Sequence, residues 1–127
     1  MLDHVSITVR DLERAAPFYD AIMDALGHPC VYRLDDALGY GIRNTPGDDG
    51  HSYLKVVRSD DACGGERHWA LRAPDRAAVE RFHAAALAAG GRDDGPPGVR
   101  PDYHPAYFAA FVLDPDGNRI EAVCHRR

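Results

Sequence analysis

The chain has 127 residues, 45% of them hydrophobic and 28% charged, and its formal net charge at pH 7 is −5. This composition is typical of a globular protein and excludes a disordered chain, and the scattered acidic excess argues against a nucleic-acid-binding stripe. We expect a single domain over 1–127, because each half would be only marginally stable alone.

No segment of the sequence approaches the run of about 20 apolar residues that a membrane span needs, and residues 1–11 lack the apolar core of a signal peptide. The cysteines, Cys30, Cys63 and Cys124, are widely spaced, which argues against a disulfide framework or a zinc knuckle. We expect Cys63 to lie in an exposed loop. These features favour a cytoplasmic protein with neither membrane nor nucleic-acid partners.

Residues 3–9 alternate apolar and polar side chains, which predicts a half-buried strand with His4 on its polar face. Asp11 is typical of a helix N-cap, apolar positions at helical spacing follow it, and Gly27 would end the helix. Short strands are predicted next, at 31–34, 38–43 and 52–58. Turn residues and glycines then mark a boundary between a first module of about 1–60 and a second of about 66–127.

The second module repeats the first, because residues 68–91 align on 4–27 without a gap. The alignment places His68 on His4, at the start of a second predicted strand. Asp75 would cap a second helix, whose buried stripe we expect to be Val79, Phe82, Ala86 and Leu87.

The rest of the second module is predicted as a loop followed by two strands. Residues 92–105 hold four prolines, which predicts a stiff loop. Strands at 107–113 and 119–124 flank a turn at 114–118. Each copy therefore reads as one strand, one helix and three strands. The predicted fold is α+β, with two tandem βαβββ modules forming a cupped, partly open mixed β-barrel and the helices outside.

Alternation along the last strand places Glu121 on the face that carries His4 and His68. Two imidazoles and a carboxylate suit a borderline divalent cation, and three ligands leave positions open for water and substrate. The alternative is that each histidine is an ordinary surface or hydrogen-bonded residue.

Two further features are candidates for chemistry. Tyr103, His104 and Tyr107 precede a core strand, where they would close over the cleft and offer a general acid or base, or else pack a proline-stiffened loop. Arg72 shares a strand face with His68 and would bind an anionic substrate group, or else pair with a neighbouring acid.

Three segments of the sequence resemble the vicinal oxygen chelate superfamily, which includes glyoxalase I, fosfomycin-resistance thiol transferases, extradiol dioxygenases and bleomycin-resistance proteins. The resemblance covers nearly the whole chain and rests on residues 3–27, 68–91 and 111–123, the last with its DPDGN turn and the glutamate beyond it. In metal-using members the ligands come from the first strand of each module and the last strand of the second. The resemblance thus implies His4, His68 and Glu121 as ligands of Fe, Mn, Ni, Co or Zn.

The sequence also departs from individual branches of this superfamily. Glyoxalase I enzymes take a fourth ligand from the last strand of module one, where this chain offers Tyr53, Lys55 or Val57, with His51 just before the strand. Extradiol dioxygenases carry a tyrosine where Phe111 stands here. We identify no counterpart of the cationic loop of the fosfomycin transferases.

The resemblance implies a divalent-metal-dependent enzyme, of lyase/isomerase or dioxygenase-like type, that acts on a small oxygen-chelating organic substrate. The alternative is a metal-free protein that sequesters a drug or another small molecule, as bleomycin-resistance proteins do. A homodimer is expected, with or without exchange of modules between subunits. If modules are exchanged, His4 would come from one subunit and the pair of His68 and Glu121 from the other.

Overall fold

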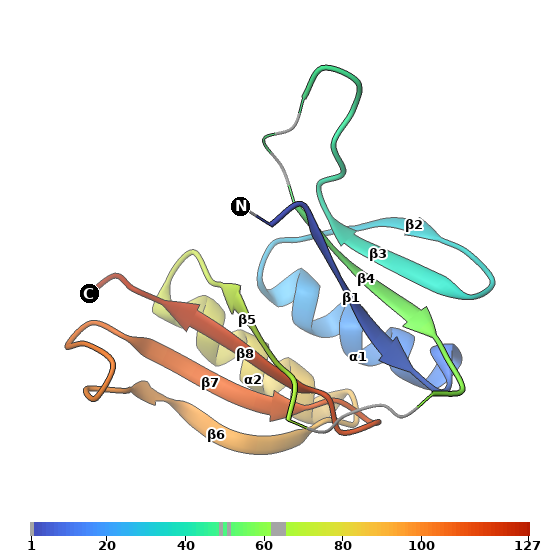
Figure 1. Cartoon of the computed structure of the whole chain (residues 1–127). Coiled ribbons are helices and arrows are strands. Elements are labelled where there is room, and N and C mark those ends of the chain that lie inside the picture. The colour runs from blue at the N-terminus through green and yellow to red at the C-terminus, as the bar shows by residue number, and fades with distance from the viewer. Residues whose placement is uncertain (1, 49, 51, 62–65) are drawn as a thin grey trace.

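The computed structural model describes residues 2–48, 50, 52–61 and 66–127, and within them the chain forms two helices and eight strands (Figure 1). The elements of module one are β1 (His4–Val9), α1 (Leu12–Ala25), β2 (Cys30–Arg33), β3 (Ala37–Gly41) and β4 (Tyr53–Arg58). The elements of module two are β5 (His68–Arg72), α2 (Arg76–Ala88), β6 (Arg92–Val99), β7 (Phe108–Leu113) and β8 (Arg119–Cys124).

The two modules form two four-stranded sheets with the same topology, in the orders β1-β4-β3-β2 and β5-β8-β7-β6. In each sheet the first strand pairs in parallel with the last strand of its module, and the other pairs are antiparallel. The sheets are not closed into a barrel, so β1 and β5 each lie at an edge. The predicted tandem βαβββ modules are thereby confirmed.

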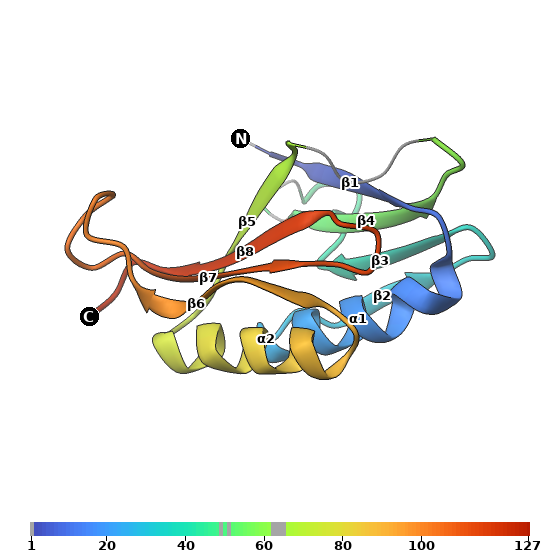
Figure 2. The same ribbon diagram turned by 90° about the horizontal axis from the view of Figure 1, so that it is seen from below.

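Both helices lie on one side of the molecule, under the sheets, and pack against each other (Figure 2). Each begins where the sequence predicts, because Asp11 Oδ1 accepts the amide of Arg14 at 3.1 Å and Asp75 Oδ1 accepts that of Ala78 at 2.7 Å. The apolar faces of helices and sheets share one core. Leu87 departs from the prediction, since it is 42% exposed while Ala78 takes part in the buried stripe of α2.

The predicted loop at 92–105 is wrong over its first half, which forms β6 (Arg92–Val99). This strand lies at an edge of its sheet, and its register shifts between Asp93 and Gly95 and again between Gly95 and Gly98. An edge strand needs ladder bonds on one side only, and irregular register leaves positions outside the ladder, so Pro96 and Pro97 are tolerated.

A buried hydrogen-bond network joins the β7–β8 turn to module one. Asp114 is fully buried and accepts hydrogen bonds from the hydroxyl of Tyr19 (2.7 Å), the amides of Asn118 (2.7 Å) and Asp116 (2.9 Å) and the side-chain amide of Asn118 (2.8 Å). Asn118 also donates to the carbonyl of Thr8 on β1. A buried carboxylate is stable only when it is hydrogen-bonded in this way.

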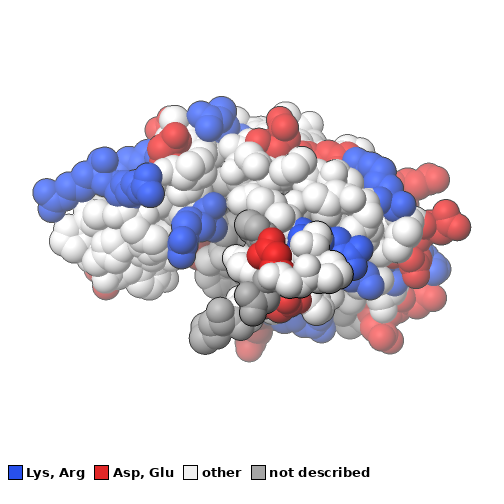
Figure 3. Space-filling model, turned by 90° about the horizontal axis from the view of Figure 1, so that it is seen from above, with Lys and Arg blue, Asp and Glu red and all other residues white. Residues whose placement is uncertain are grey.

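Charged side chains of both signs are interspersed over the face seen in Figure 3. In the described part of the chain, the helices are too short or too polar to cross a membrane.

Candidate functional site

Glu121 is the centre of the half site on module two. It lies in the middle of β8, is 1% exposed, and its Oε2 lies 2.8 Å from Nε2 of His68, the first residue of β5. Its other oxygen, Oε1, accepts the hydroxyl of Tyr107 at 2.6 Å. The structure therefore brings His68 and Glu121 together, as the alternation predicts, and it places the hydroxyl of Tyr107, another candidate from the sequence, on the second carboxylate oxygen.

The bond to Glu121 also fixes the state of Tyr107. Burial and the neighbouring carboxylate raise the pKa of the Tyr107 hydroxyl well above its usual value. The phenol, which is protonated at neutral pH even without this shift, acts as a hydrogen-bond donor. It holds one carboxylate oxygen in place and leaves the other facing His68.

His4 forms a second half site, on module one. Its Nδ1 lies 2.6 Å from Oδ1 of Asp3, and the side chain of Asn44 donates to the other oxygen of Asp3 at 2.8 Å. The His4 ring stacks on Tyr53, with centroids 5.2 Å apart. The bond to His4 lowers the pKa of Asp3. A carboxylate that holds one ring nitrogen and leaves the other open is typical of metal-ligating histidines.

Within one chain, His4 and the pair of His68 and Glu121 do not form one group of ligands. Among the described residues, no group of three or more His, Cys, Asp or Glu side chains is placed to hold a metal ion. The donors themselves suit a divalent cation: a buried carboxylate, an imidazole beside it and a carboxylate-oriented imidazole. The ligand chemistry fits a divalent cation, but within one chain His4 is not grouped with the pair of His68 and Glu121.

The loop before β7 places aromatic rings beside this half site. His104 accepts the amide of Ala106 at Nδ1, so its Nε2 carries a proton and lies 2.9 Å from Nδ1 of His125. The ring of Tyr107 packs edge-on against both imidazoles. The ring of Tyr103 lies tilted against that of Tyr107, with centroids 4.8 Å apart, and Tyr103 is 66% exposed. His125, which the sequence does not single out, is thus part of the cluster, and its place on the Glu121 face of the last strand is the signal that points to it.

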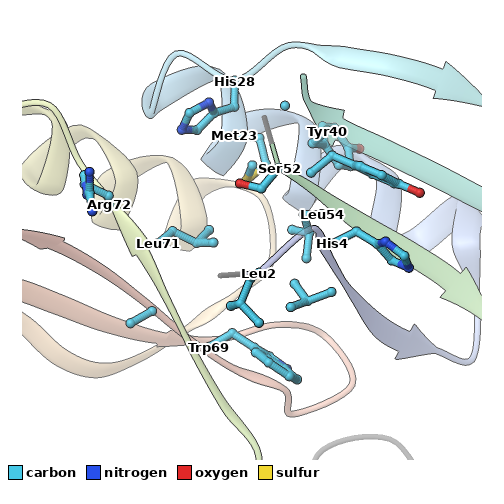
Figure 4. A pocket seen from close by; sticks show the side chains of 14 residues that line it. Leu2, His4, Met23, His28, Tyr40, Ser52, Leu54, Trp69, Leu71 and Arg72 are labelled. Carbon is cyan, nitrogen blue, oxygen red and sulfur yellow. The ribbon is translucent and has the colours of Figure 1, made fainter. Parts of the chain in front are cut away.

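Arg72 lies elsewhere. It lines a pocket of about 510 Å³ at the junction of the modules, together with His4, His28, Tyr53 and Trp69. Figure 4 shows Arg72 and His28 on the opposite side of this pocket from His4. The predicted anion-binding arginine therefore shares a pocket with His4 but lies across it.

The face of module one that carries His4 also holds an aromatic and cationic cluster. Tyr32 and Tyr53 meet edge to face at 6.3 Å, and the guanidinium of Arg43 lies 5.3 Å and 5.6 Å from their ring centroids. Lys55 stands on the same face of β4, partly buried. The alternation of residues 52–57 places Tyr53 and Lys55 on one face of the strand. It does not predict that the two tyrosine rings pack with the guanidinium of Arg43. His51 and Cys63 lie outside the described residues.

Comparison with known proteins gives a consistent result. The family model described as Glyoxalase/Bleomycin resistance protein/Dioxygenase superfamily matches residues 1–122. A glyoxalase/bleomycin resistance protein from Albidiferax ferrireducens is 27% identical, with a TM-score of 0.81 over 97% of this chain and 98% of that one. No curated protein matches this chain in sequence.

Two more distant structures share the fold. A glyoxalase I variant from Zea mays is 24% identical, with a TM-score of 0.70 over 98% of this chain and 46% of that chain. The fosfomycin resistance protein FosX from Mesorhizobium loti is 21% identical, with a TM-score of 0.65 over 97% of this chain and 90% of that one.

Proposed function

Since the chain belongs to the glyoxalase/bleomycin resistance protein/dioxygenase superfamily, we propose that it is a divalent-metal-dependent enzyme acting on a small oxygen-chelating substrate. The observation that carries this proposal is the pair of His68 and the buried Glu121, 2.8 Å apart, with Tyr107 holding the second carboxylate oxygen. The reaction is of lyase/isomerase or dioxygenase-like type.

The third ligand in this proposal is His4 of a second subunit. β1 and β5 lie at edges of their sheets, and each begins with one of the two histidines. A homodimer that places β1 of one subunit beside β5 of the other would bring His4 to the pair of His68 and Glu121. The bond from His4 Nδ1 to Asp3 supports this role, because it occupies Nδ1 and leaves Nε2 available to bind a cation.

The roles of the side chains follow from their contacts. His4, His68 and Glu121 would hold the cation, which supplies Lewis acidity toward vicinal oxygens of the substrate when it is bound. Tyr107 positions Glu121 by donating to Oε1. His104 carries a proton on Nε2 and contacts His125, so this imidazole pair would exchange protons with the substrate at the rim of the site.

The first test is metal content. Purified protein without a histidine tag, incubated with Fe, Mn, Ni, Co or Zn salts, would retain about one ion per chain, and the His4→Ala and Glu121→Ala variants would lose it. If the wild-type protein retains none of these ions, a metal-free small-molecule-sequestering protein becomes the better account. The aromatic cluster of Tyr32, Tyr53 and Arg43 would then be the candidate binding surface.

A heterodimer distinguishes shared sites from sites within one chain. Two differently tagged variants, His4→Ala and Glu121→Ala, would be unfolded, mixed, refolded and purified as the mixed pair. If each site combines His4 of one subunit with Glu121 of the other, one of the two sites in the mixed pair is intact and binds metal. If each site lies within one chain, both sites are damaged and the mixed pair binds none.

A further inference from the structure

Lys55 occupies in module one the register position that Glu121 occupies in module two. Glu121 pairs with Ala70, two residues beyond His68 on β5. Lys55 pairs with Ser6, two residues beyond His4 on β1. The duplicated architecture therefore places an ammonium group where its other copy places the buried carboxylate.

Lys55 is the only lysine in the chain, whose other Lys and Arg positions are all arginine. On β4 its neighbours Leu54 and Val56 are buried toward the helix, so Lys55 stands on the opposite face, which also carries Tyr53 and His4. A lysine there differs from an arginine, since it presents a compact point charge on a flexible stem rather than a planar fork.

The positive charge of Lys55 is not neutralised by its surroundings. No hydrogen bond or ion pair joins it to another residue in the described ranges. The guanidinium of Arg43, on the same module, lies over the rings of Tyr32 and Tyr53. An ammonium group without a hydrogen-bond or ion-pair partner can form a charge-assisted hydrogen bond to an incoming anion.

A glycine and an aromatic ring lie beside Lys55. Gly39 is its register partner on β3, and the ring of Tyr32 lies over Gly39, since a Cβ atom added there would stand 2.1 Å from Tyr32 Cε1. The face thus combines a cation with an aromatic ring and a strip of backbone. A small planar or compact carbon skeleton would fit against such a surface.

We propose that Lys55 binds a carboxylate of the substrate, separate from the oxygens that a metal would hold, and that the substrate is therefore a small organic anion. This inference rests on the proposed function, because His4 on the same face would bring the half site of a second subunit to Lys55. A protonated lysine cannot ligate a metal, so this position of β4 supplies a charge for the substrate and no fourth metal ligand.

The test uses two matched probes, 3,4-dihydroxybenzoate and the neutral 3,4-dihydroxybenzamide, titrated calorimetrically into the homodimer with and without Zn²⁺. Wild-type protein is expected to bind the acid at least about tenfold more tightly than the amide, which is the effect of one charge-assisted hydrogen bond. Lys55→Gln would remove this preference without lowering metal content, and Lys55→Arg would keep part of it. Arg58→Gln is the control, because Arg58 lies at the end of the same strand and pairs with exposed Asp60.

The single lysine allows a direct measurement of contact. Reductive ¹³C-methylation labels Lys55 and the α-amino group, whose signals separate by pKa. Saturating acid would shift the Lys55 resonance and the amide would not. Lys55→Glu would reverse the acid preference and, by adding a carboxylate, tighten Zn²⁺ binding about tenfold or more.

The proposal is overturned if Lys55→Gln keeps the preference for the acid, or if neither probe binds at millimolar concentration. If metal content is normal and the protein shows no preference for the acid, the proposal for Lys55 fails and the proposed metal site stands. If the protein binds no metal but prefers the acid and shows a shifted Lys55 resonance, the proposed metal site fails and the proposal for Lys55 stands. The two proposals therefore fail in distinguishable ways.

Discussion

The two oxygens of the Glu121 carboxylate have different partners, and this division determines what the residue can do. Oε1 accepts the Tyr107 hydroxyl, and Oε2 faces Nε2 of His68. Burial removes most of the water around the carboxylate. The two contacts therefore determine its orientation and supply the hydrogen bonds that a buried negative charge needs. A cation bound by both Oε2 and His68 would neutralise the negative charge of the carboxylate.

Tyr107→Phe is expected to weaken metal binding by about 10-fold to 100-fold, the usual effect of losing a hydrogen bond to a ligand. The ring and its packing stay, and only the donor to Glu121 Oε1 is lost. The measurement is the dissociation constant for Zn²⁺ from competition with a chelating dye. Tyr103→Phe is the matched control, because the Tyr103 ring packs against Tyr107 and its hydroxyl donates no hydrogen bond to Glu121. An equal loss in both variants would contradict the role of the Tyr107 hydroxyl.

The free energy of unfolding should fall with rising pH above about 10. Burial raises the pKa of Tyr19 and of Tyr40 in the folded protein, and each donates to a carboxylate. Below pH 10 both phenols are protonated in both states, so their contribution is fully present. Above it the unfolded chain loses protons that the folded chain keeps, which costs about 1.4 kcal/mol per pH unit for each tyrosine.

Urea unfolding from pH 8 to 11 measures this loss. Tyr40→Phe should reduce the slope above pH 10, because the variant has one titrating phenol fewer. Unchanged slopes in Tyr40→Phe and Tyr19→Phe would show that other groups cause the alkaline loss.

At the scale of elements, the β7–β8 turn joins the modules through Asp114. Asp114→Asn is expected to lower the free energy of unfolding by about 2–3 kcal/mol, because one oxygen that accepts hydrogen bonds becomes a donor. The midpoint of urea unfolding measures the loss. Asp60→Asn is the control, since its side chain is 88% exposed and pairs with Arg58 on the surface, where an ion pair contributes little.

Most elements of the fold follow from local signals in the sequence. Both N-caps and the alternation of β1, β5 and β8 predict the observed structure to within a residue or two. β6 was predicted as a loop because Pro96 and Pro97 argue against a strand, and only the neighbouring strand shows that the segment lies at an edge. The exposure of Leu87 likewise depends on how α2 sits against its sheet, which periodicity does not determine.

The candidate site could be predicted only in part for a similar reason. Alternation places His68 and Glu121 on one face, and their sheet brings them together. The separation of His4 from them depends on how the two modules are arranged, which strand patterns do not encode. The bond from Tyr107 to Glu121 depends on the path of a loop, so the sequence indicates the residue without indicating its role.

At the scale of the whole molecule, metal binding and stability should be linked. A divalent ion at 100 times its dissociation constant would raise the free energy of unfolding by about 2.7 kcal/mol. Thermal unfolding with and without Zn²⁺ measures this gain. The gain should disappear in Glu121→Ala and in His4→Ala, and a gain that persists in both would place the ion elsewhere.

The position of β8 in its sheet has a consequence for synthesis. β8 lies between β5 and β7, yet it leaves the ribosome after both of them. Until it arrives, β5 and β7 have no partner between them, and Tyr19 has no completed turn to donate to. Module one shares its core with module two and would be only marginally stable before then, so the second sheet and the carboxylate of the candidate site form together in one late step. A chain interrupted before β8 would expose an unfilled sheet and become a substrate for quality control instead of a partly active protein.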